Sequence, residues 1–165
     1  MQETRTGNML LITFSDNPEV RKAASAAFEG ARDLITTHLL EEQVLAKTGG
    51  TMIYDGVIIG TESFSKKNFS KIIESTDWRG KKIGLFALDD KNLEKTKKIF
   101  AANGAQVISA VTLKPEGGLL FLKKGELNEG QIARAKAVGE RLGRVLTGKR
   151  PTQVKEKNRI TGYKK

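Results

Sequence analysis

Short apolar runs alternate with segments of helical spacing along most of this chain. Residues 9–14 (MLLITF) form a continuous apolar run, and residues 55–60 (DGVIIG) form a second one that is rich in β-branched residues. Such runs are typical of strands that are buried on both faces of a parallel sheet. Less continuous apolar patterns predict three more strands, at 33–37, 80–87 and 106–113.

Apolar residues between these strands recur at spacings of three and four residues, which predicts helices. The expected helices run from Pro18 to about Ala31, over residues 68–75, from Leu93 to Ala102 and over residues 132–146. The first helix has a defined start, since Asn17 can cap it and Pro18 suits the first helical position. Two segments are less regular: 41–47 is expected as a short helix or loop, and 119–122 as a short strand-like piece.

The alternation of strand and helix predicts an α/β fold. Each parallel crossover needs a helix, so five such strands are expected to form a three-layer, doubly wound sandwich around a parallel sheet. The 165 residues, 38% of them hydrophobic, suffice for one domain with its own core. We expect this domain at 1–146, followed by a basic C-terminal tail at 147–165.

The tail carries much of the positive charge. The chain has a formal net charge of +10, and residues 147–165 contribute +6 of it, with seven Lys or Arg residues against Glu156. Such segments bind polyanions because neutralising phosphates releases counterions. The tail is expected to dock on RNA, on a ribonucleoprotein such as the ribosome, or on an acidic protein surface; a solubilising tail is the alternative. The residues expected at the contact are Lys149, Arg150, Lys155, Lys157, Arg159, Tyr163, Lys164 and Lys165.

The residue types that are missing exclude several kinds of chemistry. Without cysteine, the chain has no disulfide, thiolate metal site or cysteine nucleophile. His38 is the only histidine, so neither a two-histidine metal site nor a catalytic residue is predicted. No apolar run approaches the roughly 20 residues of a membrane span, and the first residues lack a secretory signal. A soluble, cytoplasmic protein without a membrane partner is therefore expected.

Four segments resemble a known family. The strongest match is Tyr54–Thr61 (YDGVIIGT) followed by Trp78–Phe86 (WRGKKIGLF), with support from Asn103–Ala105 and Ala137–Leu142. In their order along the chain these segments resemble the flavodoxins and the related FMN-dependent reductases. The resemblance implies the flavodoxin-like sheet order 2-1-3-4-5 and an FMN crevice at the carboxyl ends of the strands.

Three loops would line this crevice, at residues 15–20, 61–68 and 88–91. In the family the first loop holds the FMN phosphate and the second borders the flavin ring, where Phe64 would be either a stacking platform or a hydrophobic anchor. If FMN binds, the resemblance assigns it to Ser15, Asn17, Thr61, Ser63, Phe64 and Asp89. Taken alone, Asp89 and its neighbour Asp90 are expected to cap the helix that begins near Leu93 rather than to bind a cation.

The first loop departs from the family's phosphate-binding pattern. That pattern combines several hydroxyls, a glycine and helix amides, whereas this loop keeps a hydroxyl only at Ser15. Asp16 and Glu19 place carboxylates where a dianion would lie, which opposes binding by on the order of 1 kcal/mol each. Pro18 has no amide hydrogen to donate. The loop is therefore interpreted as a phosphate site that has lost its function, and the cofactor prediction is either none or FMN.

The sequence leaves two functions open. The first is a non-enzymatic binding or structural protein with a degraded FMN site, which docks through its basic tail. The second is an FMN-binding electron-transfer protein or FMN-dependent oxidoreductase, in which the flavin supplies the chemistry. Under the first interpretation basic residues of the body extend the docking surface, unless they only reflect a lysine-rich composition: Lys66, Lys67, Lys71, Arg79, Lys81, Lys82, Lys95, Lys97 and Lys98.

Overall fold

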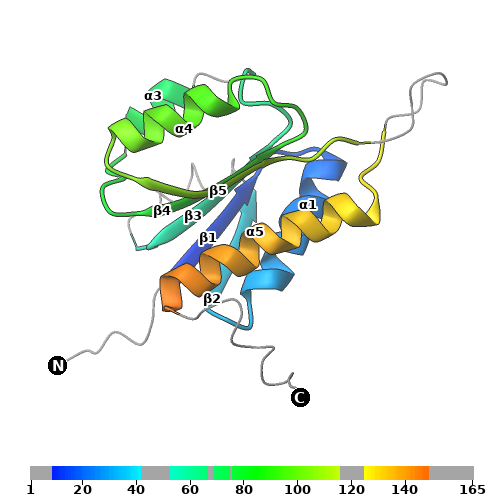
Figure 1. Ribbon diagram of the computed structural model, residues 1–165, viewed down its shortest axis with the longest axis horizontal. Helices are drawn as coiled ribbons and strands as arrows, with labels where there is room; N and C mark the ends of the chain where they lie inside the picture. Colours follow the sequence, from blue (N-terminus) through cyan, green and yellow to red (C-terminus); the bar gives the residue numbers. More distant parts are fainter. Residues whose placement is uncertain (1–8, 42–52, 67–68, 75, 116–124, 149–165) are drawn as a thin grey trace, which may run out of the picture.

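The computed structural model describes residues 9–41, 53–66, 69–74, 76–115 and 125–148. Within these residues the chain forms a three-layer α/β sandwich (Figure 1). Five strands pair in parallel, in the order β2-β1-β3-β4-β5. The predicted fold class and strand order are thereby confirmed.

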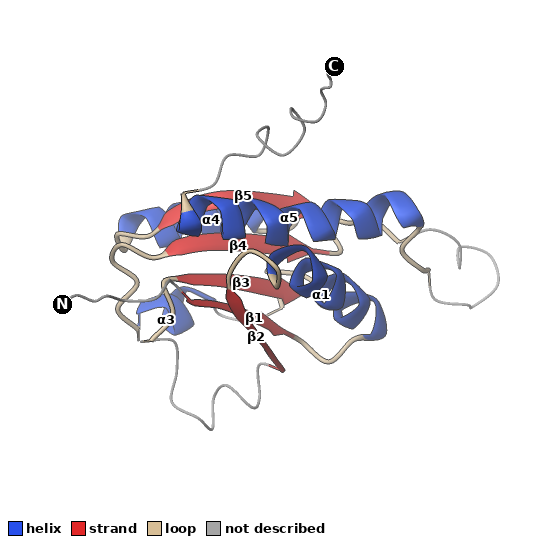
Figure 2. Ribbon diagram, turned by 90° about the horizontal axis from the view of Figure 1, so that it is seen from below, coloured by secondary structure: helices blue, strands red, loops and turns tan. Residues whose placement is uncertain are grey.

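The elements follow the predicted alternation. The strands are β1 (Met9–Phe14), β2 (Thr36–Glu41), β3 (Gly56–Thr61), β4 (Lys82–Ala87) and β5 (Gln106–Thr112). The described helices are α1 (Pro18–Ala31), α3 (Phe69–Glu74), α4 (Leu93–Ala102) and α5 (Glu129–Thr147). Helices α1 and α5 cover one face of the sheet, and α3 and α4 cover the other (Figures 1 and 2).

Strand β1 lies between β2 and β3 and is buried on both faces, which explains its continuous apolar run. Leu10 and Ile12 belong to the hydrophobic cluster that includes residues of α1 and α5, whereas Leu11 belongs to the cluster that includes residues of α4. Successive side chains of a strand point to opposite faces, so one strand serves both cores. The sheet therefore separates two hydrophobic layers and leaves its carboxyl edge to loops.

Glycines bring α1 and α5 into close contact. A Cβ at Gly139 would lie 1.9 Å from the carbonyl oxygen of Ala27, and one at Gly30 would lie 2.3 Å from the carbonyl oxygen of Lys136. Real Cβ atoms are not found at such distances, so only glycine allows the two backbones to approach in this way. The contact fixes α5 alongside α1.

Strand β2 differs from its prediction. It runs over Thr36–Glu41 rather than 33–37, because the amide of Ile35 still donates to the carbonyl of Ala31 at the end of α1. The parallel register with β1 begins only at Thr36. As an edge strand β2 is partly exposed, and its polar residues give it no continuous apolar run.

Some predicted features lie outside the described residues: residues 42–47, the strand-like piece at 119–122 and the basic tail from 149 onward. Helix α5 ends at Thr147, and Gly148 follows with a φ of 78°, a left-handed conformation that favours glycine. The division into a domain and a tail stays a prediction. In the part of the chain that the structure describes, no helix has both the length and the apolar composition that crossing a bilayer requires.

Candidate functional site

Three loops meet at the carboxyl edge of the sheet, where they follow β1, β3 and β4. The amide of Ser15 donates to the carbonyl of Gly60 over 3.1 Å, and the amide of Leu88 donates to the carbonyl of Glu62 over 3.0 Å. The structure therefore brings together the described parts of the loops that the sequence assigns to the crevice.

The amino end of α1 is capped by a side chain of its own loop. Asn17 Oδ1 accepts hydrogen bonds from the amides of Glu19 (2.8 Å) and Val20 (3.2 Å), as its place before the helix predicts. Pro18, which lies between Asn17 and Glu19, has no amide hydrogen. A phosphate at a helix start would use these same amides. In this chain the Asn17 side chain already occupies them.

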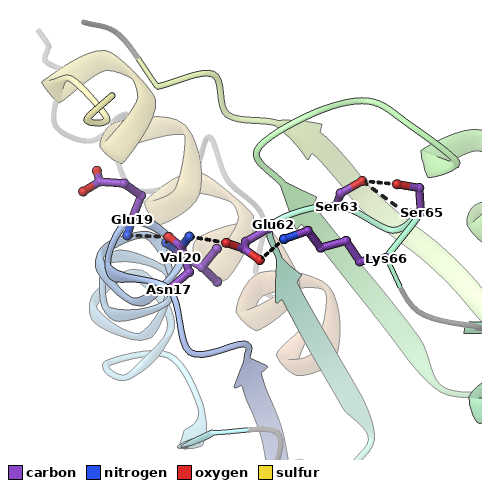
Figure 3. A network of polar contacts seen from close by, with 7 residues as sticks. All are labelled: Asn17, Glu19, Val20, Glu62, Ser63, Ser65 and Lys66. Carbon is purple, nitrogen blue, oxygen red and sulfur yellow. Dashed lines mark hydrogen bonds and ion pairs between the residues drawn. The ribbon is translucent and has the colours of Figure 1, made fainter. Parts of the chain in front are cut away.

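A carboxylate from the second loop lies against this cap. Asn17 Nδ2 donates to Glu62 Oε2 over 2.5 Å, and Lys66 Nζ lies 2.6 Å from Glu62 Oε1 (Figure 3). Since the Glu62 carbonyl also accepts the amide of Leu88, this one residue links all three loops. Its negative charge stands beside the helix start, in the region where a phosphate would have to lie.

Two further carboxylates belong to the first loop and the first turn of α1. Glu19 Oε1 accepts the amide of Leu127 over 2.7 Å and lies 3.2 Å from Lys22 Nζ. Asp16 pairs with Arg21 over 2.6 Å. Each carboxylate thus has a cation beside it, so the loop needs no added anion to balance its charge. The described residues do not fit a phosphate dianion, because it would compete with three carboxylates for these partners.

A groove of about 710 Å³ opens beside the first loop and is lined by α1 and by Ile132 of α5, and no residue of the second loop lines it. Its lining mixes both charges with apolar surface and consists of Asp16, Pro18, Arg21, Lys22, Ser25, Ala26, Glu29 and Ile132. The groove therefore shares Asp16 and Pro18 with the first loop, and none of its lining residues belongs to the expected flavin-ring site.

The residues that the sequence assigns to a flavin ring point inward. Phe64 is 1% exposed and packs in the core beneath the loop, and Thr61 and Ser63 are both buried. Ser63 Oγ lies 2.7 Å from Ser65 Oγ and accepts the Ser65 amide (Figure 3). Phe64 anchors its loop in this arrangement, and stacking on a flavin would require its ring to leave the core.

Asp89 closes a turn and does not cap α4, so that prediction is wrong. Its Oδ1 accepts the amide of Lys91 over 3.0 Å. The residue at the helix start is Asn92, which has a φ of 59° and makes no side-chain cap bond. Asp90 contributes only its backbone carbonyl, which accepts the amide of Leu93. The left-handed turn at Asn92 separates both carboxylates from the helix amides.

The hydroxyl of Ser15, directly after β1, has no hydrogen-bond partner within the described segments. Among the described residues, Ser15 Oγ and Thr13 Oγ1 are buried side-chain atoms without a hydrogen-bond partner. A buried hydroxyl left in this state costs about 1–3 kcal/mol. Of the family's phosphate-binding features, the Ser15 hydroxyl is therefore the one that a ligand oxygen could still satisfy here.

His38 has a structural contact in β2. Its Nδ1 lies 2.7 Å from the hydroxyl of Tyr54, and the two rings meet edge to face. Burial raises the pKa of the Tyr54 hydroxyl above its ordinary value. No cluster of His, Cys, Asp or Glu in the described segments is arranged to hold a metal ion.

The described loops at the carboxyl edge of the sheet carry more acidic than basic residues. Residues 15–17, 62–66, 88–92, 113–115 and 125–128 hold five carboxylates against three cations. The acidic residues are Asp16, Glu62, Asp89, Asp90 and Glu126, and the basic ones are Lys66, Lys91 and Lys114. The net positive charge of the chain therefore does not come from these loops.

Comparison with known proteins finds similarity in structure alone. No protein family profile matches the sequence, and no curated protein matches it. Flavodoxin 1 from Bacillus cereus superposes with a TM-score of 0.59 at 17% identity, over 84% of this chain and 99% of that one. An archaeal flavodoxin gives 0.58 at 9% identity, over 84% and 98%. The chain has the flavodoxin-like fold. A diflavin flavoprotein A3 from Nostoc sp. agrees, with a TM-score of 0.60 at 14% identity over 86% and 95%.

The residue that sequence reasoning missed in this flavodoxin-like edge is Glu62. Its spacing of four residues from Lys66 is a signal for an ion pair, but nothing in the sequence joins it to Asn17. That contact arises because β1 and β3 are neighbours in the sheet and end side by side.

Proposed function

We propose that this flavodoxin-like chain is a non-enzymatic binding protein that works without FMN as a resident cofactor and docks on RNA, alone or within a ribonucleoprotein. The fold supplies a rigid body, and the basic tail supplies affinity for phosphates. RNA is preferred to an acidic protein surface because clustered Lys and Arg side chains gain affinity for every phosphate they neutralise.

The observation that carries this proposal is the Asn17–Glu62 contact at the start of α1. In a flavin-binding member of the fold a phosphate would use that helix start, whereas here a side-chain amide takes up the helix amides and a carboxylate lies beside it. Anion binding at the carboxyl edge is therefore disfavoured by both missing donors and like charge.

The distribution of charge supports docking elsewhere on the molecule. The described loops of the carboxyl edge have an excess of acidic residues, while the chain as a whole has a net charge of +10. Much of that excess belongs to residues 147–165, with a net charge of +6. A polyanion is attracted to the basic part and repelled from the acidic edge.

The test is a salt series of RNA binding with the full-length chain. Fluorescence anisotropy with a labelled single-stranded RNA should give an affinity that falls about 300-fold between 50 and 200 mM salt, as expected for about six phosphate contacts. A full-length variant with the seven Lys and Arg residues of 149–165 changed to Gln should lose most of this affinity and most of the salt dependence.

Two outcomes would contradict the proposal. RNA binding that is unchanged in the tail variant would mean that the tail is not the docking element. Labelled polyglutamate that binds as tightly as RNA at equal ionic strength would assign the partner to the acidic proteins.

FMN binding is the second candidate, and the observation that favours it is the unpartnered Ser15 hydroxyl. On this alternative, Ser15 would contact the phosphate, Asn17 would release the helix amides, and Thr61 and Ser63 would lie near the ring. All three side-chain hydrogen bonds of Asn17 would then have to break. This alternative predicts tight FMN binding and is decided by a flavin titration.

A further inference from the structure

Helix α5 has one face on which arginine is the only charged residue type. At 100° per residue, Arg134, Arg141 and Arg144 fall within about 80° of arc around the helix axis. The other residues within or bordering this arc are small or apolar: Gly130, Ala133, Ala137, Val145 and Gly148. The helix's two acidic residues, Glu129 and Glu140, lie on the flank nearer α1, where the Glu140 side chain meets Gly30.

This arginine face is directed toward the edge strand β5 and away from α1. Arg134 Nη1 donates to the carbonyl of Thr112 at the end of β5 over 2.9 Å, which fixes the orientation of the face. Figure 2 shows α5 lying along β5, with α1 on its other side. Arg134 and Arg141 are exposed, Arg144 is partly exposed, and no ion pair between described residues involves Arg134 or Arg141.

Lys82 continues the face at the amino edge of the sheet. Gly84, two residues further along β4, faces Leu142 of α5, so Lys82 lies on the same side of the sheet. Its Nζ donates to the side chain of Gln106 over 2.6 Å. Because the Gln106 side chain is neutral, this contact does not neutralise the charge of Lys82. Arg79, by contrast, is committed to Asp77 through two side-chain hydrogen bonds of 2.9 Å.

The described part of the chain ends at this same edge of the sheet. A Cβ at Gly56 would lie 2.6 Å from a methyl carbon of Leu146, and Gly56 pairs with Lys82 in the sheet. The last turn of α5 therefore lies beside the start of β4, and residue 149 follows directly after Gly148. Arg134 and Arg141 are about 10 Å apart along the helix, and Arg144 is about 4–5 Å further.

We propose that Arg134, Arg141 and Arg144 of α5, together with Lys82, form an RNA-backbone-binding strip that extends toward Gly148, the last described residue before the basic tail. Guanidinium groups suit this role because they bind phosphate oxygens in a bidentate manner. The strip does not discriminate between RNA sequences, because its contacts are to phosphates and not to bases. This inference rests on the proposed function, because it names the body surface on which the tail-bound RNA continues.

The experiment compares two full-length triple variants with the wild type in the same anisotropy assay. One is R134Q/R141Q/R144Q. The matched control is K22Q/K91Q/K136Q, which removes the same charge from three exposed lysines that lie outside the strip and outside the docking residues predicted from the sequence. Glutamine is a good helix former, and circular dichroism checks that both variants fold.

The arginine variant should bind RNA at least about tenfold more weakly at low salt, and its salt slope should fall by about 2, the loss expected for three phosphate contacts. The lysine control should stay within about threefold of the wild type. Equal losses in both variants would overturn the strip while leaving RNA docking intact. A wild type that binds no RNA, or whose binding ignores the tail charges, would instead refute the proposed function itself.

Discussion

Asn17 is the residue on which the first loop depends. Its capping role could be predicted from the sequence, because Asn before Pro18 and Glu19 is a local signal for a helix start. Its contact with Glu62 could not be predicted, because the two residues are 45 positions apart and meet only through the pairing of β1 with β3. Local chemistry is thus readable from the chain, whereas the partner of a loop side chain depends on tertiary structure.

Replacing Asn17 should destabilise the protein through the loss of this cap. Asn17→Ala leaves the amides of Glu19 and Val20 without their acceptor, so the free energy of unfolding should fall by about 1–2 kcal/mol. Urea denaturation followed by circular dichroism measures the change.

The control is Asn17→Ser, because serine caps a helix as well as asparagine does but cannot donate an amide hydrogen to Glu62. This variant should stay within about 0.5 kcal/mol of the wild type if the cap is the main contribution. Wild-type stability in Asn17→Ala would show that the observed hydrogen bonds contribute nothing to folding.

At the level of elements, the regular alternation of the chain was sufficient to predict most of the sheet. The buried strands β1, β3 and β4 and the helices α1, α4 and α5 carry strong periodic patterns and occur close to their expected places. The position of the edge strand β2 was predicted three residues too early, because a half-exposed strand lacks a continuous apolar run. The turn before α4 was misassigned because the left-handed conformation of Asn92 has no reliable signature in a non-glycine residue.

The contact between α1 and α5 makes a prediction about two glycines of the same helix. Gly139→Ala would place a Cβ 1.9 Å from the Ala27 carbonyl oxygen and force the helices apart. We expect a loss of about 1–3 kcal/mol in the free energy of unfolding, measured by urea denaturation.

Gly130→Ala is the matched control, since its nearest atom would be Asn128 Oδ1 at an ordinary 3.4 Å. The higher helix propensity of alanine should leave this variant as stable as the wild type or up to about 1 kcal/mol more stable. Similar stability of the two variants would contradict the close helix contact.

For the whole molecule, fold and charge are separate properties of the sequence. The apolar pattern determines a flavodoxin-like sheet, and residues outside that pattern decide what its carboxyl edge can bind. The sequence predicted that the first loop was a poor phosphate site from Asp16, Pro18 and Glu19. It could not predict that the Glu62 carboxylate of the second loop would lie against Asn17, nor that the arginine face of α5 would be directed toward β5.

The central claim is that the crevice of this flavodoxin-like fold does not accommodate FMN. The most direct measurement is an absorption spectrum of the purified full-length protein, followed by a titration of FMN fluorescence at low salt, with a flavodoxin stripped of its FMN as the positive control. We predict no flavin absorption and no quenching at micromolar FMN, because Asn17 and Glu62 occupy the anion site. A bound flavin spectrum, or stoichiometric quenching at micromolar FMN, would contradict this account and make the chain a flavoprotein.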